Sequence, residues 1–170
     1  MQNEADTVST KYQIYPSPIG DLILCEEDGR LTMVEFTDSD PKYQPYPDLG
    51  EDAVSESTPL LAETIRQLEE YFAGKRHDFD LPLAPQGTPF QQRVWTALRQ
   101  IPYGTTASYG QIAAAIGNPK ASRAVGMANN RNPIAVIIPC HRVIGADGSL
   151  VGYGGGLPIK KQLLELEGAL

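Results

Sequence analysis

Cysteine and histidine are scarce in this sequence, which has two of each among 170 residues. Two cysteines, Cys25 and Cys140, cannot build the disulfide framework of a small secreted scaffold, so we expect a reducing, cytoplasmic setting. No apolar run approaches the roughly 20 residues of a membrane helix, so we expect no membrane span. Residues 1–10 are polar and lack the basic-then-apolar pattern of a signal peptide.

Acidic residues are nearly missing from the second half of the chain. Residues 1–85 contain 6 Lys or Arg and 18 Asp or Glu, a net charge of −12, whereas residues 86–170 contain 8 and 3, a net charge of +5. A basic half next to an acidic half indicates a binding site for a polyanion on the basic half. The acidic half could also serve solubility alone, and the two interpretations are compatible.

The first half has the pattern of a small sheet. Alternating apolar residues predict strands over residues 11–16, 21–26, 30–37 and 78–83. Asp28-Gly29 between two of these runs predicts a hairpin. Cys25 lies within a predicted strand, where a packed thiol is expected. Residues 38–57 are rich in Asp, Pro, Tyr and Gly and predict a long surface loop.

One helix and a linker complete this half. Thr58 is a typical N-cap, and a helical apolar stripe follows it as far as Gly74. Residues 81–87 contain two prolines and a glycine and are interpreted as a linker. We therefore expect two domains, residues 1–84 and residues 85–170.

The second half begins with helical patterns. Thr88 and Ser108 each open a capping box, because a glutamine follows three residues later. Residues 117–119, Gly-Asn-Pro, predict a tight turn, and residues 120–129 predict a short helix of small residues around Arg123. Helix, turn and helix in this order are typical of a helix-turn-helix motif, although a plain helical hairpin has the same spacing.

The strongest candidates for catalytic residues directly follow an apolar run. Residues 134–138 are apolar and mostly β-branched, which predicts a buried strand that ends at Pro139. Cys140 and His141 follow at once. A thiol at such a turn can be activated, since backbone amides and a nearby imidazole favour the thiolate. The alternative is that Cys140 is a small core residue, as free cysteines often are.

Pro139-Cys140-His141-Arg142-Val143 resembles the active-site signature of the O6-alkylguanine-DNA alkyltransferases, also called methylated-DNA–protein-cysteine methyltransferases. Other segments fit the pattern of that family in order over residues 88–168: Ser108-Tyr109, Asn118-Pro119, Arg123-Ala124-Val125-Gly126, Asn132-Pro133, Gly152-Tyr153-Gly154-Gly155-Gly156, Lys160 and Glu167-Gly168. The resemblance is much weaker before residue 85. It implies an α+β fold, with a small N-terminal strand-and-helix domain of ribonuclease H-like type and a mainly helical winged helix-turn-helix domain that carries the active site.

The implied activity is direct reversal of O6-alkylguanine in DNA, with alkyl-O4-thymine as a second substrate. Cys140 takes the alkyl group irreversibly, once per molecule. His141 is the expected base, and it acts through a water because neighbours in sequence rarely face each other. Glu167 would orient the imidazole, although alone it would be interpreted as a solvated acid at a helix end. Asn132 would tie the third helix to the cysteine segment, or it is an ordinary turn residue before Pro133.

The resemblance also implies how DNA is held. The damaged base must leave the duplex, and Arg123 would hold the vacated space from the minor groove. Tyr109 would contact the target nucleotide and protonate the leaving guanine, while Gly110, Asn118 and, less strongly, Gln91 are candidates for phosphate contacts. The alkylguanine pocket would be lined by Ala135, Val143, Tyr153 and Gly154. Lys160 would bond Tyr153 or face solvent.

Two other functions remain open. The first is a non-enzymatic lesion binder on the same fold. Such binders have another residue in place of the reactive cysteine, whereas Cys140 is present here. The second is a cysteine hydrolase, which would leave the helix-turn-helix and the basic half unexplained. We expect no metal, because Cys25 and His77 are the only cysteine and histidine of the N-terminal half. We also expect no cofactor, a monomer, and double-stranded DNA carrying alkylated bases as the partner.

Overall fold

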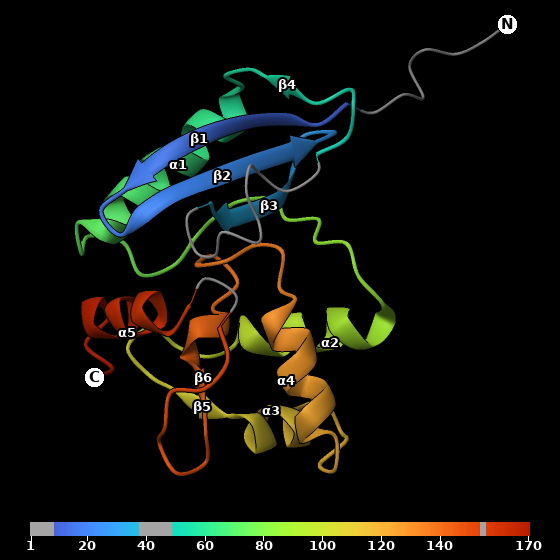
Figure 1. The fold of residues 1–170 in the computed structure, drawn as a ribbon, viewed down its shortest axis with the longest axis vertical. Coiled ribbons are helices and arrows are strands. Elements are labelled where there is room, and N and C mark those ends of the chain that lie inside the picture. The colour runs from blue at the N-terminus through green and yellow to red at the C-terminus, as the bar shows by residue number, and fades with distance from the viewer. Residues whose placement is uncertain (1–8, 38–48, 154–155) are drawn as a thin grey trace, which may run out of the picture.

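The protein is built from a sheet part and a helical part that lie against each other (Figure 1). The computed structural model describes residues 9–37, 49–153 and 156–170. Within these ranges, four strands with one helix across them form the N-terminal part, and four further α-helices, one short 3-10 helix and two short strands form the C-terminal part. No helix within these ranges is long and apolar enough to cross a membrane.

The N-terminal sheet has the strand order β3-β2-β1-β4. Its strands are β1 (Lys11–Ser17), β2 (Gly20–Glu27), β3 (Arg30–Phe36) and β4 (Val54–Ser55). The predicted hairpin is confirmed, because Asp28 and Gly29 both have positive φ, at 52° and 73°, as a tight two-residue turn requires. Cys25 is a buried free thiol in β2, as expected.

Helix α1 (Pro59–Phe72) covers one face of this sheet (Figure 1). It begins where predicted, since the Thr58 hydroxyl accepts a hydrogen bond from the Leu61 amide at 3.0 Å. Residues 38–57 were expected to be loop throughout. Residues 38–48 lie outside the described part, but β4 within this segment pairs in parallel with β1, which corrects that expectation.

The C-terminal part contains α2 (Pro89–Leu98), α3 (Tyr109–Ala115), α4 (Ser122–Asn130) and α5 (Leu157–Leu166). Both predicted capping boxes are formed, with all their reciprocal hydrogen bonds. Helix α4 packs on α2, where the Trp95 indole donates to the Ala128 carbonyl at 2.9 Å. The strands β5 (Ala107–Ser108) and β6 (Val143–Ile144) pair in parallel. The predicted α+β fold, a sheet domain followed by a helical domain, is confirmed.

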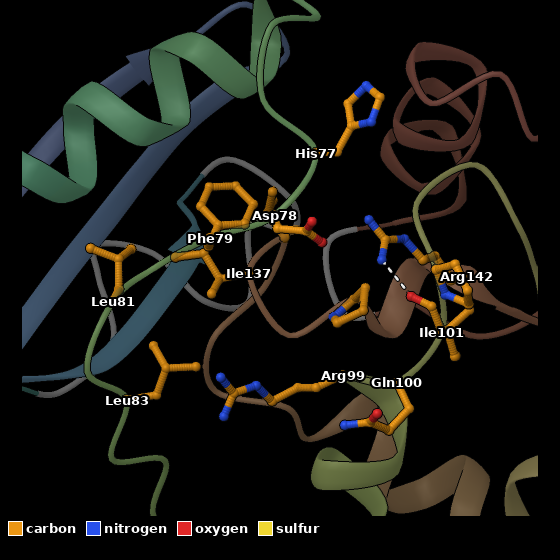
Figure 2. A pocket seen from close by; sticks show the side chains of 13 residues that line it. His77, Asp78, Phe79, Leu81, Leu83, Arg99, Gln100, Ile101, Ile137 and Arg142 are labelled. Atoms are coloured by element: carbon orange, nitrogen blue, oxygen red, sulfur yellow. Dashed lines mark hydrogen bonds between the residues drawn. The ribbon is translucent and has the colours of Figure 1, made fainter.

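A cavity of about 250 Å³ lies where the two parts meet (Figure 2). Its walls are the segment after α1, the end of α2 and the cysteine segment. His77 from the first wall stacks on Tyr103, with 3.8 Å between ring centroids and 6° between ring planes. Arg142 of the cysteine segment also lines the cavity, and its guanidinium donates to the Ile101 carbonyl at 2.7 Å. The two halves therefore touch through side chains close to the cysteine turn.

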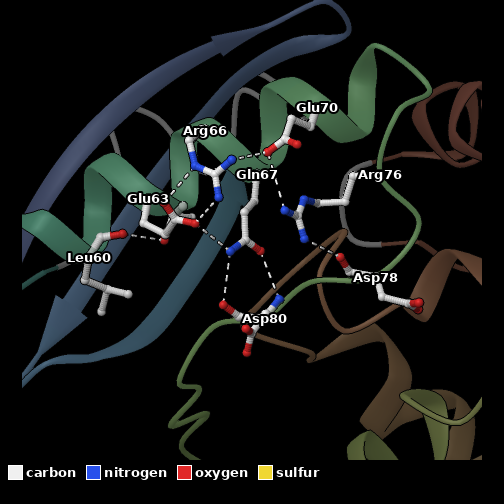
Figure 3. A network of polar contacts seen from close by, with 9 residues as sticks. Leu60, Glu63, Arg66, Gln67, Glu70, Arg76, Asp78 and Asp80 are labelled. Atoms are coloured by element: carbon white, nitrogen blue, oxygen red, sulfur yellow. Dashed lines mark hydrogen bonds and ion pairs between the residues drawn. The ribbon is translucent and has the colours of Figure 1, made fainter.

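The strand predicted for residues 78–83 is wrong. Only Leu83 pairs with β3, through an isolated bridge to Leu31. The middle of the segment is held by a side chain instead, because the buried Gln67 side-chain amide donates to the Asp80 carbonyl at 3.0 Å and accepts from the Asp80 backbone amide at 2.9 Å (Figure 3). Pro82 has no amide hydrogen to add to a ladder, so the alternating pattern yields an extended but mostly unpaired segment.

The buried strand predicted for residues 134–138 is also wrong. Ile134 forms one bridge with Val34 of β3, and then the backbone turns back on itself. The Ile138 amide donates to the Ile134 carbonyl at 3.0 Å, and Val136 between them has φ of 70°, which is rare for a β-branched residue. The segment is buried as predicted, but a short apolar run does not distinguish a buried strand from a buried turn.

Candidate active site

Cys140 opens a single 3-10 turn, Cys140–Arg142, at the end of the buried segment. The turn is fixed on the side that precedes it, since the Cys140 amide donates to the Ile138 carbonyl at 2.7 Å. It is also fixed from α4, where the side-chain amide of Asn129 donates to the Cys140 carbonyl at 3.3 Å. The cysteine is only 4% exposed, so a substrate must enter the protein to reach its sulfur.

Asn132 holds the turn segment together through its side chain. Its amide nitrogen donates to the Ile138 carbonyl at 2.8 Å and to the Ile134 carbonyl at 3.3 Å, and its oxygen accepts from the Ile134 amide at 3.0 Å. These bonds replace the ladder that a strand would have had, and they stabilise the strained Val136 conformation. Asn132 was predicted to tie α4 to the cysteine segment through its side chain; those side-chain bonds stay within residues 132–138, and the bond from α4 to Cys140 comes from Asn129.

Burial raises the pKa of the Cys140 thiol to about 11. The Asn132 side chain, the Lys160 charge and backbone N–H groups of the turn act in the opposite direction, because they favour the thiolate. Burial has the larger effect. The resting sulfur is therefore a protonated thiol near neutral pH, and a base must remove its proton before it can act as a nucleophile.

His141 is positioned as that base. Its ring is fully buried, and Nε2 lies 2.7 Å from Oε2 of Glu167. Burial lowers the pKa of His141 below its ordinary value, while Glu167 opposes this shift, so the ring is neutral at pH 7. Its Nδ1 is buried and has no hydrogen-bond partner among the described residues. With Nε2 committed to Glu167, Nδ1 is the atom left to take a proton.

Glu167 is not the solvated acid that its sequence position alone suggested. It is 5% exposed and follows α5 directly. Arg142 donates to it through Nε at 2.8 Å and through a terminal nitrogen at 3.0 Å, and the Tyr71 hydroxyl donates at 2.6 Å. Burial alone would raise the pKa of Glu167, but hydrogen bonds from His141, Arg142 and Tyr71 reverse this and hold it well below its usual range. The carboxylate therefore stays charged at working pH.

Arg142 and Tyr71 had been given no role from the sequence. The position of Arg142 inside the signature is the one sequence signal that could have suggested a role for it. Tyr71 lies in α1 of the other domain, 96 residues from Glu167, and no local pattern connects the two.

Lys160 is placed differently from either expectation. It is fully buried, and its ammonium donates to the carbonyls of Val143, Val151 and Gly152. The Tyr153 hydroxyl, the partner that had been considered, has no hydrogen-bond partner among the described residues. Burial lowers the pKa of Lys160 to about 8, against the effect of Cys140. Lys160 thus fastens the segment after β6 beside the cysteine turn.

The residues predicted for the alkylguanine pocket precede and follow Cys140 in the sequence. Val143 is buried, Ala135 and Tyr153 are half-buried, and Gly154 lies outside the described residues. Burial, followed by the charges of Cys140 and Glu167, raises the pKa of Tyr153 well above its ordinary value. Across residues 9–37, 49–153 and 156–170, no group of three or more His, Cys, Asp or Glu side chains could hold a metal ion.

Apart from Gln91, which lies in α2, the residues predicted to bind DNA lie in α3, in α4 or in the turn between them. Arg123, Gly110 and Asn118 are exposed there. The Tyr109 hydroxyl donates to the Val151 carbonyl at 2.7 Å, and burial, followed by the charge of a Cys140 thiolate, raises the pKa of Tyr109. Gln91 uses its amide oxygen to accept from the Thr88 amide at 2.9 Å within the capping box.

Two family profiles match the chain in tandem. The "6-O-methylguanine DNA methyltransferase, ribonuclease-like domain" matches residues 10–85, and the "6-O-methylguanine DNA methyltransferase, DNA binding domain" matches residues 89–169. Among solved structures, the O6-methylguanine methyltransferase of Mycobacterium tuberculosis superimposes with a TM-score of 0.80 at 46% identity, covering 94% of this chain and 93% of that one.

Curated relatives extend over almost the whole chain. A methylated-DNA–protein-cysteine methyltransferase of Methanosarcina acetivorans is 54% identical over 158 residues, which are 93% of this chain and 98% of the relative. The constitutive enzyme of that name from Bacillus subtilis is 48% identical over 92% of this chain and 94% of its own. The chain therefore belongs to the 6-O-methylguanine DNA methyltransferase family.

Proposed function

We propose that this protein repairs alkylated DNA by direct reversal and transfers the alkyl group from guanine O6 to its own Cys140. The observation that carries the proposal is a buried thiol next to a buried imidazole, with that imidazole bonded to a charged carboxylate at 2.7 Å. Curated relatives near 50% identity are named for transfer from methylated DNA to a protein cysteine, which supports this activity.

The reaction needs a soft nucleophile that displaces guanine from a saturated carbon. The Cys140 proton passes through a water to Nδ1 of His141, and Glu167 stabilises the imidazolium that forms. The sulfur then attacks the alkyl carbon, so that a C–S bond forms as the C–O bond breaks. Tyr109 remains protonated because burial raises its pKa, and with substrate bound its hydroxyl leaves the Val151 carbonyl and gives its proton to the leaving guanine. The proton held by His141 then restores Tyr109.

Double-stranded DNA is the proposed partner. A Mycobacterium tuberculosis relative at 46% identity, with a TM-score of 0.81, has been solved in complex with DNA. Helix α4 carries small residues that suit the narrow minor groove, and its exposed Arg123 would fill the space of the extruded base. Gly110 and Asn118 would contact phosphates. Gln91 is a weaker candidate because its amide oxygen already closes a capping box.

Several other assignments belong to this proposal. Residues 1–84 and 85–170 form its two domains. Alkyl-O4-thymine is a second substrate, and the protein acts as a monomer. A reducing, cytoplasmic location suits a reaction that needs the free thiol of Cys140.

Intact mass spectrometry after incubation with methylated duplex DNA tests the activity. We expect a gain of one methyl group on the peptide that contains Cys140, and one lesion repaired per protein molecule, because water at neutral pH does not displace sulfur from a thioether. A lesion binder would gain no mass, and a cysteine hydrolase would turn over acyl substrates with its thiol regenerated. Cys140→Ser is the control and should stay unmodified.

A further inference from the structure

The Glu167 carboxylate is held by residues from both domains. Its Oε2 accepts hydrogen bonds from the Tyr71 hydroxyl at 2.6 Å, from Arg142 at 3.0 Å, and shares the 2.7 Å contact with His141. We propose that Tyr71, contributed by α1 of the N-terminal domain, is a positioning residue for alkyl transfer that acts through Glu167. The inference rests on the His141–Glu167 relay proposed above.

Tyr71 donates to the same Glu167 oxygen that faces His141. Arg142 reaches both oxygens, through Nε to Oε1 and through a terminal nitrogen to Oε2, and thereby fixes one edge of the group. His141 and Tyr71 both contact Oε2, where Arg142 makes the longer of its two bonds. The Tyr71 side chain is fully buried, and its ring packs against Phe72, Phe79 and Tyr103. Its hydroxyl is therefore presented from a fixed ring.

The chemical type of this donor suits the task. Burial and the neighbouring Glu167 raise the pKa of Tyr71 far above its ordinary value, so the hydroxyl keeps its proton and always donates. Around His141, Arg142 and Lys160 disfavour its protonation and Glu167 favours it. A further cation at the position of Tyr71 would oppose the imidazolium that must form. A neutral hydroxyl orients the carboxylate without that repulsion.

A second contact joins the N-terminal sheet, on which α1 packs, to the segment that leads to Cys140. The backbone of Val34 in β3 accepts from the Ala135 amide at 2.8 Å and donates to the Pro133 carbonyl at 2.9 Å. The N-terminal sheet is thus bonded to the segment that carries Cys140, while its helix reaches Glu167. Tyr71 could serve only to dock the two domains, and the experiment below separates that role from positioning.

The test is the single-turnover alkyl-transfer rate of Tyr71→Phe, with methylated duplex DNA and with free O6-benzylguanine. We expect a loss of roughly ten-fold on both substrates, as for one hydrogen bond to a charged group. The matched control is Tyr103→Phe, a tyrosine of the same aromatic cluster whose hydroxyl contacts the Leu166 carbonyl at 3.5 Å rather than Glu167. Its rate should be unchanged. 3-Fluorotyrosine introduced at residue 71 keeps the hydroxyl and should restore the rate.

The rate measured against pH distinguishes positioning from docking. Without the hydroxyl, the carboxylate is no longer held toward the ring and stabilises the imidazolium less, so the acidic limb of the profile should move to lower pH. In the Glu167→Gln background, Tyr71→Phe should cause little further loss. A lower rate with an unmoved limb, or full additivity with Glu167→Gln, would assign Tyr71 to docking and overturn the inference. If Glu167→Gln itself retains the full rate, the relay has failed and the role of Tyr71 fails with it, whereas the mass gain on Cys140 still tests alkyl transfer separately.

Discussion

Replacing Glu167 with glutamine probes the proposed relay directly. The substitution keeps the size of the side chain but removes the charge that faces His141. It also places an amide N–H₂ among donors, because Arg142, Tyr71 and the His141 ring all present hydrogens to the carboxylate. One of these hydrogen bonds must be lost or turned around, and the buried Arg142 charge loses its partner.

The size of the effect follows from the geometry. With charge centres about 4 Å apart and an effective dielectric constant of about 20, the Glu167–imidazolium attraction is about 4 kcal/mol. The glutamine dipole retains part of it, so we expect about 3 kcal/mol less stabilisation of the imidazolium. This corresponds to a single-turnover rate roughly two orders of magnitude lower. Stability should also fall, by about 3–5 kcal/mol for a broken buried ion pair.

The assay is single-turnover transfer to Cys140 as a function of pH, with folding checked by thermal melts. Because the thiol pKa is raised to about 11, the defect should persist through neutral pH and shrink only as the pH approaches that value, where solvent removes the proton. Glu165→Gln is the matched control on the same helix, since Glu165 is exposed and its carboxylate makes a surface ion pair with Lys161 at 3.8 Å. It should leave the rate unchanged.

Three outcomes would refute the relay. The first is a rate for Glu167→Gln that equals that of Glu165→Gln in folded protein. The second is a defect that remains constant up to the highest pH measured. The third is full additivity of Glu167→Gln with His141→Ala, which would show that Glu167 only holds α5 in place. If the relay is correct, His141→Ala should behave like Glu167→Gln, and the double variant should be little worse than either one, as for residues that act as a unit.

The remaining predictions concern extrusion and the second cysteine. Arg123→Ala should slow repair in duplex DNA but change the rate with free O6-benzylguanine far less, because a free base needs no unstacking; equal losses would assign Arg123 to the fold or the pocket. For Cys25, burial raises the folded-state pKa to about 12, so the folded protein retains a proton that the unfolded chain loses above about pH 9. Stability should therefore fall as the pH rises from 9 toward 12, and Cys25→Ala should reduce that slope in thermal melts; an unchanged slope would contradict this.

Local structure followed closely from local sequence. Thr58, Thr88 and Ser108 begin helices at the predicted residues, and Asp28-Gly29 makes the predicted turn. In each case a side chain bonds to a backbone group no more than three residues away, or a residue tolerates positive φ. Such features depend on near neighbours only and can be predicted without knowledge of the fold.

Predictions that depended on distant partners were less secure. The runs over residues 78–83 and 134–138 were predicted as strands, yet Gln67 and Asn132 supply the hydrogen bonds that a ladder would have supplied. Apolar periodicity reports that a segment is buried or extended, and it carries no information about which donor satisfies its backbone.

The same division applies to the candidate site. The sequence by itself determined the reactive pair, because Cys140 and His141 adjoin within a recognisable signature, and it placed an excess of basic charge on the half that carries them. Only the tertiary structure decided that Glu167 is buried and charged, that Arg142 and Tyr71 hold it, and that Lys160 lies inside the protein. The reason is physical, since burial and pairing of a charge depend on groups that the fold brings from as far as 96 residues away.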